Sequence, residues 1–365
     1  MPEITLDRIV KCFDKNGLWI ISFDPTDADG YKMVALQYNI FVEQNNPNKK
    51  FYIFYSSKAC PTNEVRMSKP TDTECDCQDE EQKELECVAS LLSQLTPNAI
   101  LVTGSRHVNS PLPLKFVKNA HEVYSELSGP NTITIIDIET AAFQIKEHLE
   151  KYPINKICMD FVGCIGYFPK IKSLIGETKL AKGLEGQIIL VMGGILEEFP
   201  PQTMALPGRH PYTTMNQLYD KVATKEFYDF CIKYNQPLLF CTNTKTNEFA
   251  KFIDDEDMNG AEKMTGLLAK ITSKWFGPHL KGKYVDFDTF AFCCYVLMML
   301  DSTAVDYEVR YLHLYDNPAI NLLSKKSDPI SLENTVAVDS SLKVFSVNKV
   351  TQNWLDIIDI ILSQK

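Results

Sequence analysis

Short apolar runs alternate along the chain with longer stretches of helical character. Apolar runs bounded by turn signals predict buried strands at residues 18–23, 50–55, 99–103, 154–162, 186–192 and 237–241. Amphipathic spacing or apolar length predicts helices at 31–41, 83–94, 137–152, 223–234, 286–300 and 354–362. Two further segments, 307–314 and 335–347, alternate as strands do. This order predicts an α/β fold with an open, mostly parallel sheet and helices on both faces.

The length of 365 residues fits one large α/β domain or two small ones. No internal repeat or low-complexity tract divides the chain. We therefore expect a single domain over residues 1–365. Residues 59–82 are polar and charged and contain proline, so we expect an insertion there that forms a surface loop.

The composition excludes several classes of protein. Hydrophobic residues make up 45% and charged residues 23% of the chain, as in an ordinary globular protein. The net charge of -10 repels phosphate backbones. The lysine pairs at 49–50 and 325–326 are interpreted as solvated turns, so no nucleic-acid partner is expected. The longest apolar run, 290–300, is shorter than the roughly 20 residues that span a bilayer. Because a signal-peptide pattern is also missing, we expect a soluble, cytoplasmic protein without a membrane partner.

Eleven cysteines are present. Some lie in apolar segments and are expected to be small buried residues: Cys158, Cys164, Cys231, Cys241, Cys293 and Cys294. Others surround an acidic segment: Cys60, Cys75, Cys77 and Cys87. This second group is either a zinc site or a set of solvated and partly buried thiols. The C-x-C spacing of Cys75 and Cys77 departs from the usual zinc-binding spacing and favours the thiols.

Three carboxylates, Asp24, Asp27 and Asp29, follow the first predicted strand. In parallel sheets, ligands bind at the carboxyl ends of the strands. Clustered carboxylates repel one another unless a cation or solvent screens them, and calcium prefers oxygen ligands of this kind. The segment is therefore either part of a calcium site or a solvated acidic loop.

Three later segments carry further candidate residues. Gly193 and Gly194 follow the predicted strand at 186–192 and would let a ligand approach the main chain closely. Asn216 precedes a helix, where it either caps that helix or bonds a sugar hydroxyl. Asp288 begins an apolar helix. Its side chain either caps that helix or points into the site as a distant metal ligand.

The order and spacing of these segments resembles the inosine–uridine nucleoside hydrolases. That family opens with a strand and a D-x-D-P-G-x-D-D loop. A Gly-rich loop, an MGG motif, an N-x-x-x-D helix start and an H-D-P helix start follow. The counterparts here are residues 22–29, 162–166, 192–194, 216–220 and 287–289. The resemblance extends from about residue 17 to the carboxyl terminus and implies the Rossmann-like sheet of that family.

The resemblance implies calcium-dependent hydrolysis of the N-glycosidic bond of a nucleoside. Asp24 is then both a calcium (Ca2+) ligand and the general base. Asp29, Asp288 and the carbonyl of Val162 are the other implied ligands. Contacts to the substrate are implied for Asn216, Met192, Gly193, His210 and Phe287. The implied partner is a nucleoside or another ribose-containing ligand, and the implied assembly is a homodimer or homotetramer.

Thr26 replaces the loop Gly of the family pattern, Val162 stands where the family usually has Thr, and three further departures bear on activity. Ala28 stands where the family has an Asp that bonds a ribose hydroxyl, and Thr214 stands where a ribose-contacting Glu is common. Phe287 stands where many members have a His that protonates the leaving base. Loss of a general acid lowers the rate roughly 10²–10⁴-fold. Two hypotheses remain open: a nucleoside hydrolase with an unusual leaving-group pocket, or an inactive protein of that fold with a ligand-binding, structural or storage role.

Overall fold

The centre of the fold is a sheet, to which the described residues contribute 11 strands. The computed structural model describes residues 3–25, 27–42, 48–57, 74–106, 124–198, 210–249, 266–268, 270–271, 286–300, 303, 305–351 and 354–362. The parallel part of the sheet contains, in spatial order, β4 (Thr134–Asp137), β3 (Ile100–Arg106), β2 (Lys50–Ser57), β1 (Asn16–Phe23), β5 (Lys156–Phe161), β6 (Ile189–Met192), β8 (Leu238–Cys241) and β11 (Ala337–Val350).

The far side of the sheet is mixed. Next to β11 lies the antiparallel β9 (Val305–Tyr315), followed by β10 (Leu322–Ser324), which is antiparallel to β9. The last strand, β7 (Ile195–Leu196), is parallel to β10. The predicted open, mostly parallel sheet is thus confirmed. The carboxyl ends of β1, β2, β5, β6 and β8 meet at one edge of the sheet.

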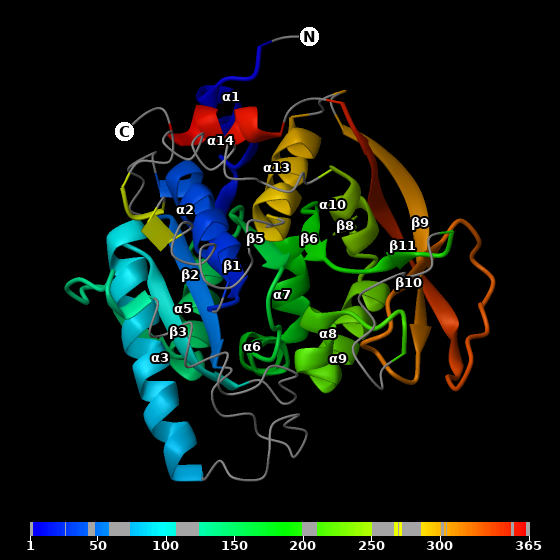
Figure 1. Ribbon diagram of the computed structural model, residues 1–365, viewed down its shortest axis with the longest axis horizontal. Coiled ribbons are helices and arrows are strands. Elements are labelled where there is room, and N and C mark those ends of the chain that lie inside the picture. Colours follow the sequence, from blue (N-terminus) through cyan, green and yellow to red (C-terminus); the bar gives the residue numbers. More distant parts are fainter. Residues whose placement is uncertain are drawn as a thin grey trace.

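Helices cover both faces of the sheet because its central strands are apolar on both sides. Along β1, Trp19, Ile21 and Phe23 enter one hydrophobic cluster, while Leu18 and Ile20 enter another. The first cluster includes α1 (Leu6–Cys12), α2 (Ala28–Val42), α3 (Glu74–Leu95), α13 (Phe287–Met299) and α14 (Leu355–Leu362). The second includes α5 (Ile138–Lys151), α6 (Phe168–Ile175), α7 (Glu177–Leu184) and α9 (Lys221–Lys233) (Figure 1). None of the described helices is long and apolar enough to cross a membrane.

The predicted surface loop is wrong in part. Residues 74–82 form the first turns of α3. Glu and Gln favour helices even where no apolar stripe is present. Because the apolar spacing begins only at residue 83, it does not predict these first turns. Glu80 and Glu84 are in fact buried. Residues 59–73 of the predicted insertion lie outside the described residues.

Several short elements have no counterpart in the predicted pattern: α1, α6, α7, α10 (Asn243–Phe249), β4, β7 and β10. β4 is an edge strand whose side chains are mostly exposed, so it lacks an apolar run. α6 and α7 are short and meet at Gly176, whose φ of 94° interrupts the helical backbone. Such short elements contain too few residues to establish a periodicity.

Lys49 does not lie in a solvated turn, contrary to the prediction. Its ammonium lies 4.8 Å from the centroid of the Phe41 ring and donates to the Phe13 carbonyl at 3.3 Å. Burial lowers the pKa of Lys49 accordingly. Lys325 and Lys326 are exposed, as predicted.

The cysteines predicted to be small buried residues are all buried, and Cys87 is buried too. These cysteines are free thiols. Cys60 and the side chains of Cys75 and Cys77 lie outside the described part of the chain, so the choice between zinc ligands and ordinary thiols stays open.

Candidate functional site

The loops that follow β1 and β5 pack directly on each other. Asp24 comes immediately after β1, and Gly163 lies just beyond β5. A Cβ at Gly163 would lie 3.0 Å from the Ser22 carbonyl oxygen and 3.1 Å from the Asp24 amide nitrogen. Only glycine allows two main chains to approach this closely. The contact brings the first acidic loop against the loop that contains Val162.

Asp29 connects the first turn of α2 to the start of α13. Its Oδ2 accepts hydrogen bonds from the amides of Phe287 at 3.0 Å and Asp288 at 3.2 Å. These amides have no partner within their own helix, and a negative charge is favoured at this end of a helix. Asp29 therefore acts as a cap for α13, although the two helices are far apart in sequence. The interaction places Asp288 beside Asp29.

Asp24, Asp29 and Asp288 are buried together at the carboxyl edge of the sheet, with exposures of 6%, 5% and 5%. The position of a Cβ at Gly30 would be 2.9 Å from the Asp24 carbonyl oxygen and 3.5 Å from Asp288 Oδ2. The structure thus brings together the three carboxylates that the sequence predicted as metal ligands.

The carboxylates at this edge repel one another. Burial, followed by the charges of Asp27 and Asp286, raises the pKa of Asp29 well above its ordinary range. Burial and the charges of Asp29, Asp27 and Asp24 raise the pKa of Asp288 in the same way. A bound cation would relieve this repulsion.

The donor atoms of the cluster are of the type that calcium binds, but their present arrangement is not that of a metal site. Buried carboxylate and carbonyl oxygens are the ligands that calcium prefers. Among the described residues, however, no group of three His, Cys, Asp or Glu is arranged to hold a metal ion. Asp29 Oδ2 accepts from two amides of α13.

Val162 and Asn216, both predicted site residues, are in direct contact. The side-chain Nδ2 of Asn216 donates to the Val162 carbonyl at 2.5 Å. Asn216 lies within the short helix α8 (Met215–Tyr219) and is 8% exposed. The amide that was expected to bond a sugar hydroxyl is thus also bonded to the loop after β5.

Met192 and Gly193 end β6 and pack against α8. Gln217 Nε2 donates to the Met192 carbonyl at 3.3 Å. Gly193 has a φ of 129°, and a Cβ there would lie 3.1 Å from Gln217 Oε1. Glycine is therefore required at this turn, which contacts Gln217, the residue that follows Asn216.

Thr214 belongs to a hydrogen-bond network of the interior. It is 2% exposed, and its hydroxyl donates to Gln217 and accepts from Asn321 Nδ2 at 3.2 Å. Tyr228 extends the network by donating to Asn321 Oδ1 at 2.6 Å. Ala28, at the other departure from the family pattern, is a buried residue at the start of α2. Neither residue offers a free carboxylate to a ligand.

Phe287 and His210 differ in their position relative to the carboxylate cluster. Phe287 begins α13 and is half-buried next to Asp288. His210 accepts from the Tyr212 amide at 3.3 Å, and burial lowers its pKa while the charge of Glu333 acts in the opposite direction. No described contact joins His210 to the carboxylates. Phe287 thus adjoins the cluster, whereas His210 is not brought to it.

Two features of the site were not predicted from sequence. Asp160 on β5 accepts from Ser22 and Gln37, and burial raises its pKa to about 7. Lys32 on α2 pairs with Asp286 before α13. A carboxylate within an otherwise apolar strand and a lysine within an apolar helix are the sequence signals that would have indicated them.

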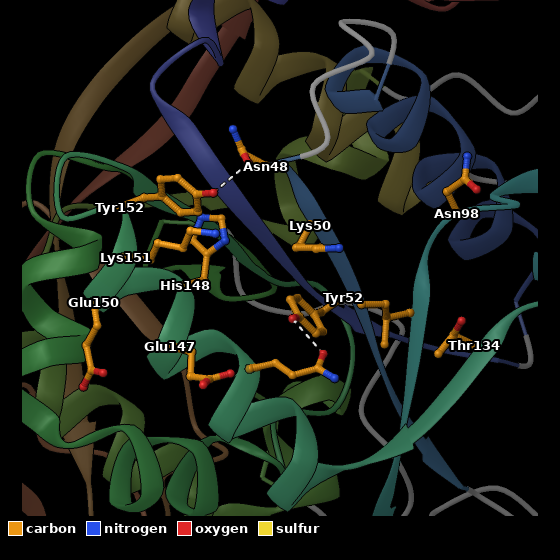
Figure 2. Close-up of a pocket in the computed structure, with 12 residues that line it drawn as sticks. Asn48, Lys50, Tyr52, Asn98, Thr134, Glu147, His148, Glu150, Lys151 and Tyr152 are labelled. Carbon is orange, nitrogen blue, oxygen red and sulfur yellow. Dashed lines mark hydrogen bonds between the residues drawn. The ribbon is translucent and has the colours of Figure 1, made fainter.

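A pocket of about 1000 Å³ lies at the opposite end of the strands. Lys50, Ile100 and Thr134 are the first residues of β2, β3 and β4, and they line it together with the last turns of α5. Figure 2 shows His148 and Lys151 on one side of this pocket and Thr134 on the other. Because the carboxylate cluster follows the carboxyl ends of the strands, this pocket is not part of the candidate site.

Comparison with known proteins identifies the fold. No known protein family and no curated protein matches the sequence. An inosine–uridine preferring nucleoside hydrolase from Bacillus anthracis matches the structure with a TM-score of 0.60 at 14% identity, over 96% of this chain and 100% of that chain. A plant nucleoside hydrolase matches with a TM-score of 0.56 at 11% identity, over 96% and 99%. The type III effector XopQ, solved with adenosine diphosphate ribose, matches with a TM-score of 0.54 at 12% identity, over 98% and 97%. The chain therefore has the fold of the nucleoside hydrolases, which a type III effector shares.

Proposed function

We propose that this protein binds the ribose of a nucleoside at the carboxylate cluster, with the help of calcium, and hydrolyses the N-glycosidic bond. One observation carries the proposal. Asp24 and Asp29 meet Asp288, which lies 259 residues beyond Asp29, at the strand edge where ligands bind in such sheets. The fold shared with nucleoside hydrolases supports the same assignment.

The residues present suit this chemistry. Cleavage of an N-glycosidic bond develops positive charge on the ribose in an oxocarbenium-like transition state, which buried carboxylates stabilise. Asp24 would accept a proton from the attacking water as general base. Asp24, Asp29, Asp288 and the Val162 carbonyl would hold the calcium ion. When bound, the ion would supply positive charge that orients ribose hydroxyls and acidifies water.

The remaining predicted residues would shape the pocket. Asn216 would bond the ribose from the side of α8, next to Met192 and Gly193. Phe287 would stack on the nucleobase without providing a proton, so protonation of the leaving base would fall to water. His210 would contact the ligand as the resemblance implies.

A second candidate function is binding without catalysis. It is favoured by Thr214, which stands where the family commonly has a ribose-contacting Glu. The Thr214 hydroxyl instead bonds to Gln217 and Asn321 in the interior. The effector solved with adenosine diphosphate ribose indicates that ribose-containing ligands larger than nucleosides belong in the test.

The two candidates differ in one experiment. The chain is stripped with EDTA, and its melting temperature is measured with and without calcium, together with release of free base from inosine and uridine. Calcium-dependent stabilisation with base release supports the hydrolase. Stabilisation by calcium and by adenosine diphosphate ribose without base release supports binding alone. Indifference to calcium contradicts the calcium site in both proposals.

Matched variants connect the result to the cluster. Asp24→Asn should abolish base release, because an amide cannot accept the proton, while Asp316→Asn on the exposed surface should leave it unchanged. The implied homodimer or homotetramer stays a prediction, which light scattering of the purified chain would test.

A further inference from the structure

Asp160 is a carboxylate in the middle of the sheet. It lies on the central strand β5 and is 2% exposed. Its Oδ1 accepts from the Ser22 amide at 3.1 Å, and its Oδ2 accepts from Gln37 Nε2 at 3.1 Å. No lysine or arginine in the described part of the chain pairs with it. A buried carboxylate without a cation is unfavourable unless hydrogen bonds satisfy it. The hydrogen bonds of Asp160 therefore indicate its role.

Ser22 connects Asp160 to the loop after β5. The Ser22 hydroxyl oxygen accepts from the amides of both Val162 and Gly163, each at 3.0 Å. Two incoming donors occupy the lone pairs of a hydroxyl. The hydroxyl proton is therefore directed to Asp160, whose Oδ1 lies 3.3 Å away and whose main-chain carbonyl oxygen lies 3.4 Å away. The carboxylate is the stronger acceptor of the two. Asp160 thus fixes the orientation in which Ser22 receives the two amides.

The peptide held in this way faces the candidate site. The Val162 carbonyl accepts from Asn216, and Gly163 packs against the amide of Asp24. We infer that Asp160, acting through Ser22, is a positioning residue that sets the Val162 carbonyl relative to Asp24 and Asn216. The consequence for calcium rests on the proposed function, whereas the position of the peptide does not.

The test compares two buried serines in the full-length protein. Ser22→Ala removes the acceptor of both amides. Ser346→Ala on β11 is the matched control, because Ser346 is equally buried and its hydroxyl has no hydrogen-bond partner among the described residues. Hydrogen exchange with mass spectrometry follows the Val162 and Gly163 amides. We expect roughly tenfold faster exchange in Ser22→Ala and none of this change in Ser346→Ala.

A second variant keeps the test decisive if Ser22→Ala fails to fold. Asp160→Asn retains the shape and removes the charge, and a neutral oxygen is a weaker acceptor than a carboxylate. The same amides should exchange faster by a smaller factor. Exchange as slow as in the wild type in the folded variants would overturn the inference.

Calcium affinity separates this inference from the proposed function. Titration calorimetry with calcium chloride should show binding weakened roughly tenfold in Ser22→Ala, as for partners that orient metal ligands. Faster exchange with unchanged calcium affinity would overturn the positioning role at the site. A wild type that binds no calcium would contradict the proposed function, and the exchange result would still decide whether Asp160 and Ser22 hold the peptide.

Discussion

Lys32 of α2 and Asp286 before α13 form an ion pair in the interior, with Nζ and Oδ2 2.5 Å apart. Their side chains are 4% and 0% exposed. Asp286 also caps α13, because its Oδ1 accepts from the Thr289 amide at 3.2 Å. The pair therefore ties the helix that contains Asp288 to the helix that contains Asp29.

Lys32→Met should strongly destabilise the protein. The substitution leaves the Asp286 carboxylate buried without its cation, which lowers the free energy of unfolding by about 3–5 kcal/mol. Adding Asp286→Asn should recover part of this loss, because the amide oxygen still caps α13 without a charge. Urea unfolding measures both variants. Lys225→Met, which breaks an exposed pair with Asp229, should change the free energy by only about 0–1 kcal/mol. Equal effects of the two lysine substitutions would contradict the prediction.

Thr214→Val should lower stability without weakening ligand binding. Loss of the hydroxyl leaves buried polar groups of Gln217 and Asn321 without a partner, at a cost of about 1–3 kcal/mol in the free energy of unfolding. Thr289→Val is the control, because the Thr289 hydroxyl is buried without a hydrogen-bond partner among the described side chains, and we expect little change. Thermal unfolding and nucleoside titration measure the two effects. Weaker nucleoside binding at unchanged stability would show that Thr214 contacts the ligand.

The convergence of the carboxylates could be predicted because it follows from a topological rule. Asp24 and Asp29 follow a buried strand, and parallel strands place such loops at one edge of the sheet. Asp288 was recognised at a helix start by its resemblance to a family motif. The orientation of Asp29 Oδ2 towards the amides of α13 could not be predicted, since it depends on a partner 258 residues away.

Local patterns also failed to reveal the polar network beneath the site. Asp160 lies in an apolar run, and its partners Ser22 and Gln37 come from a strand and a helix elsewhere in the chain. Such bonds leave no periodic signal. The same limitation explains α3, whose polar first turns resemble a loop in the hydrophobic pattern and are helical in the structure.

Gly163→Ala should disturb the contact between the two site loops. A Cβ there would lie 3.0 Å from main-chain atoms of Ser22 and Phe23, which cannot rotate away. We expect a loss of about 1–3 kcal/mol in the free energy of unfolding, together with weaker calcium binding. Gly129→Ala is the matched control, because its Cβ would lie 3.0 Å from the flexible end of Gln94. A control variant as unstable as Gly163→Ala would refute the explanation.

His148 makes the stability of the protein depend on acid. It is 8% exposed near the amino ends of the strands, and its Nε2 lies 3.2 Å from Asn155 Nδ2. Burial, followed by the charges of Lys50 and Lys151, lowers its pKa from 6.5 to about 4. Between these values the unfolded chain binds a proton that the folded chain does not. Stability contributed by neutral His148 is therefore complete above about pH 6.5 and declines as the pH falls towards 4.

His148→Gln should remove this contribution. The wild type should lose more stability than the variant between neutral pH and pH values below the ordinary pKa of histidine, because glutamine takes up no proton. Urea unfolding across that range gives the difference, so that titration of carboxylates common to both proteins cancels. Lys50→Met should weaken the acid dependence by removing one of the two repelling charges, whereas Lys325→Met on a distant exposed turn should leave it unchanged. Parallel pH profiles for the wild type and His148→Gln would assign the acid sensitivity to other groups.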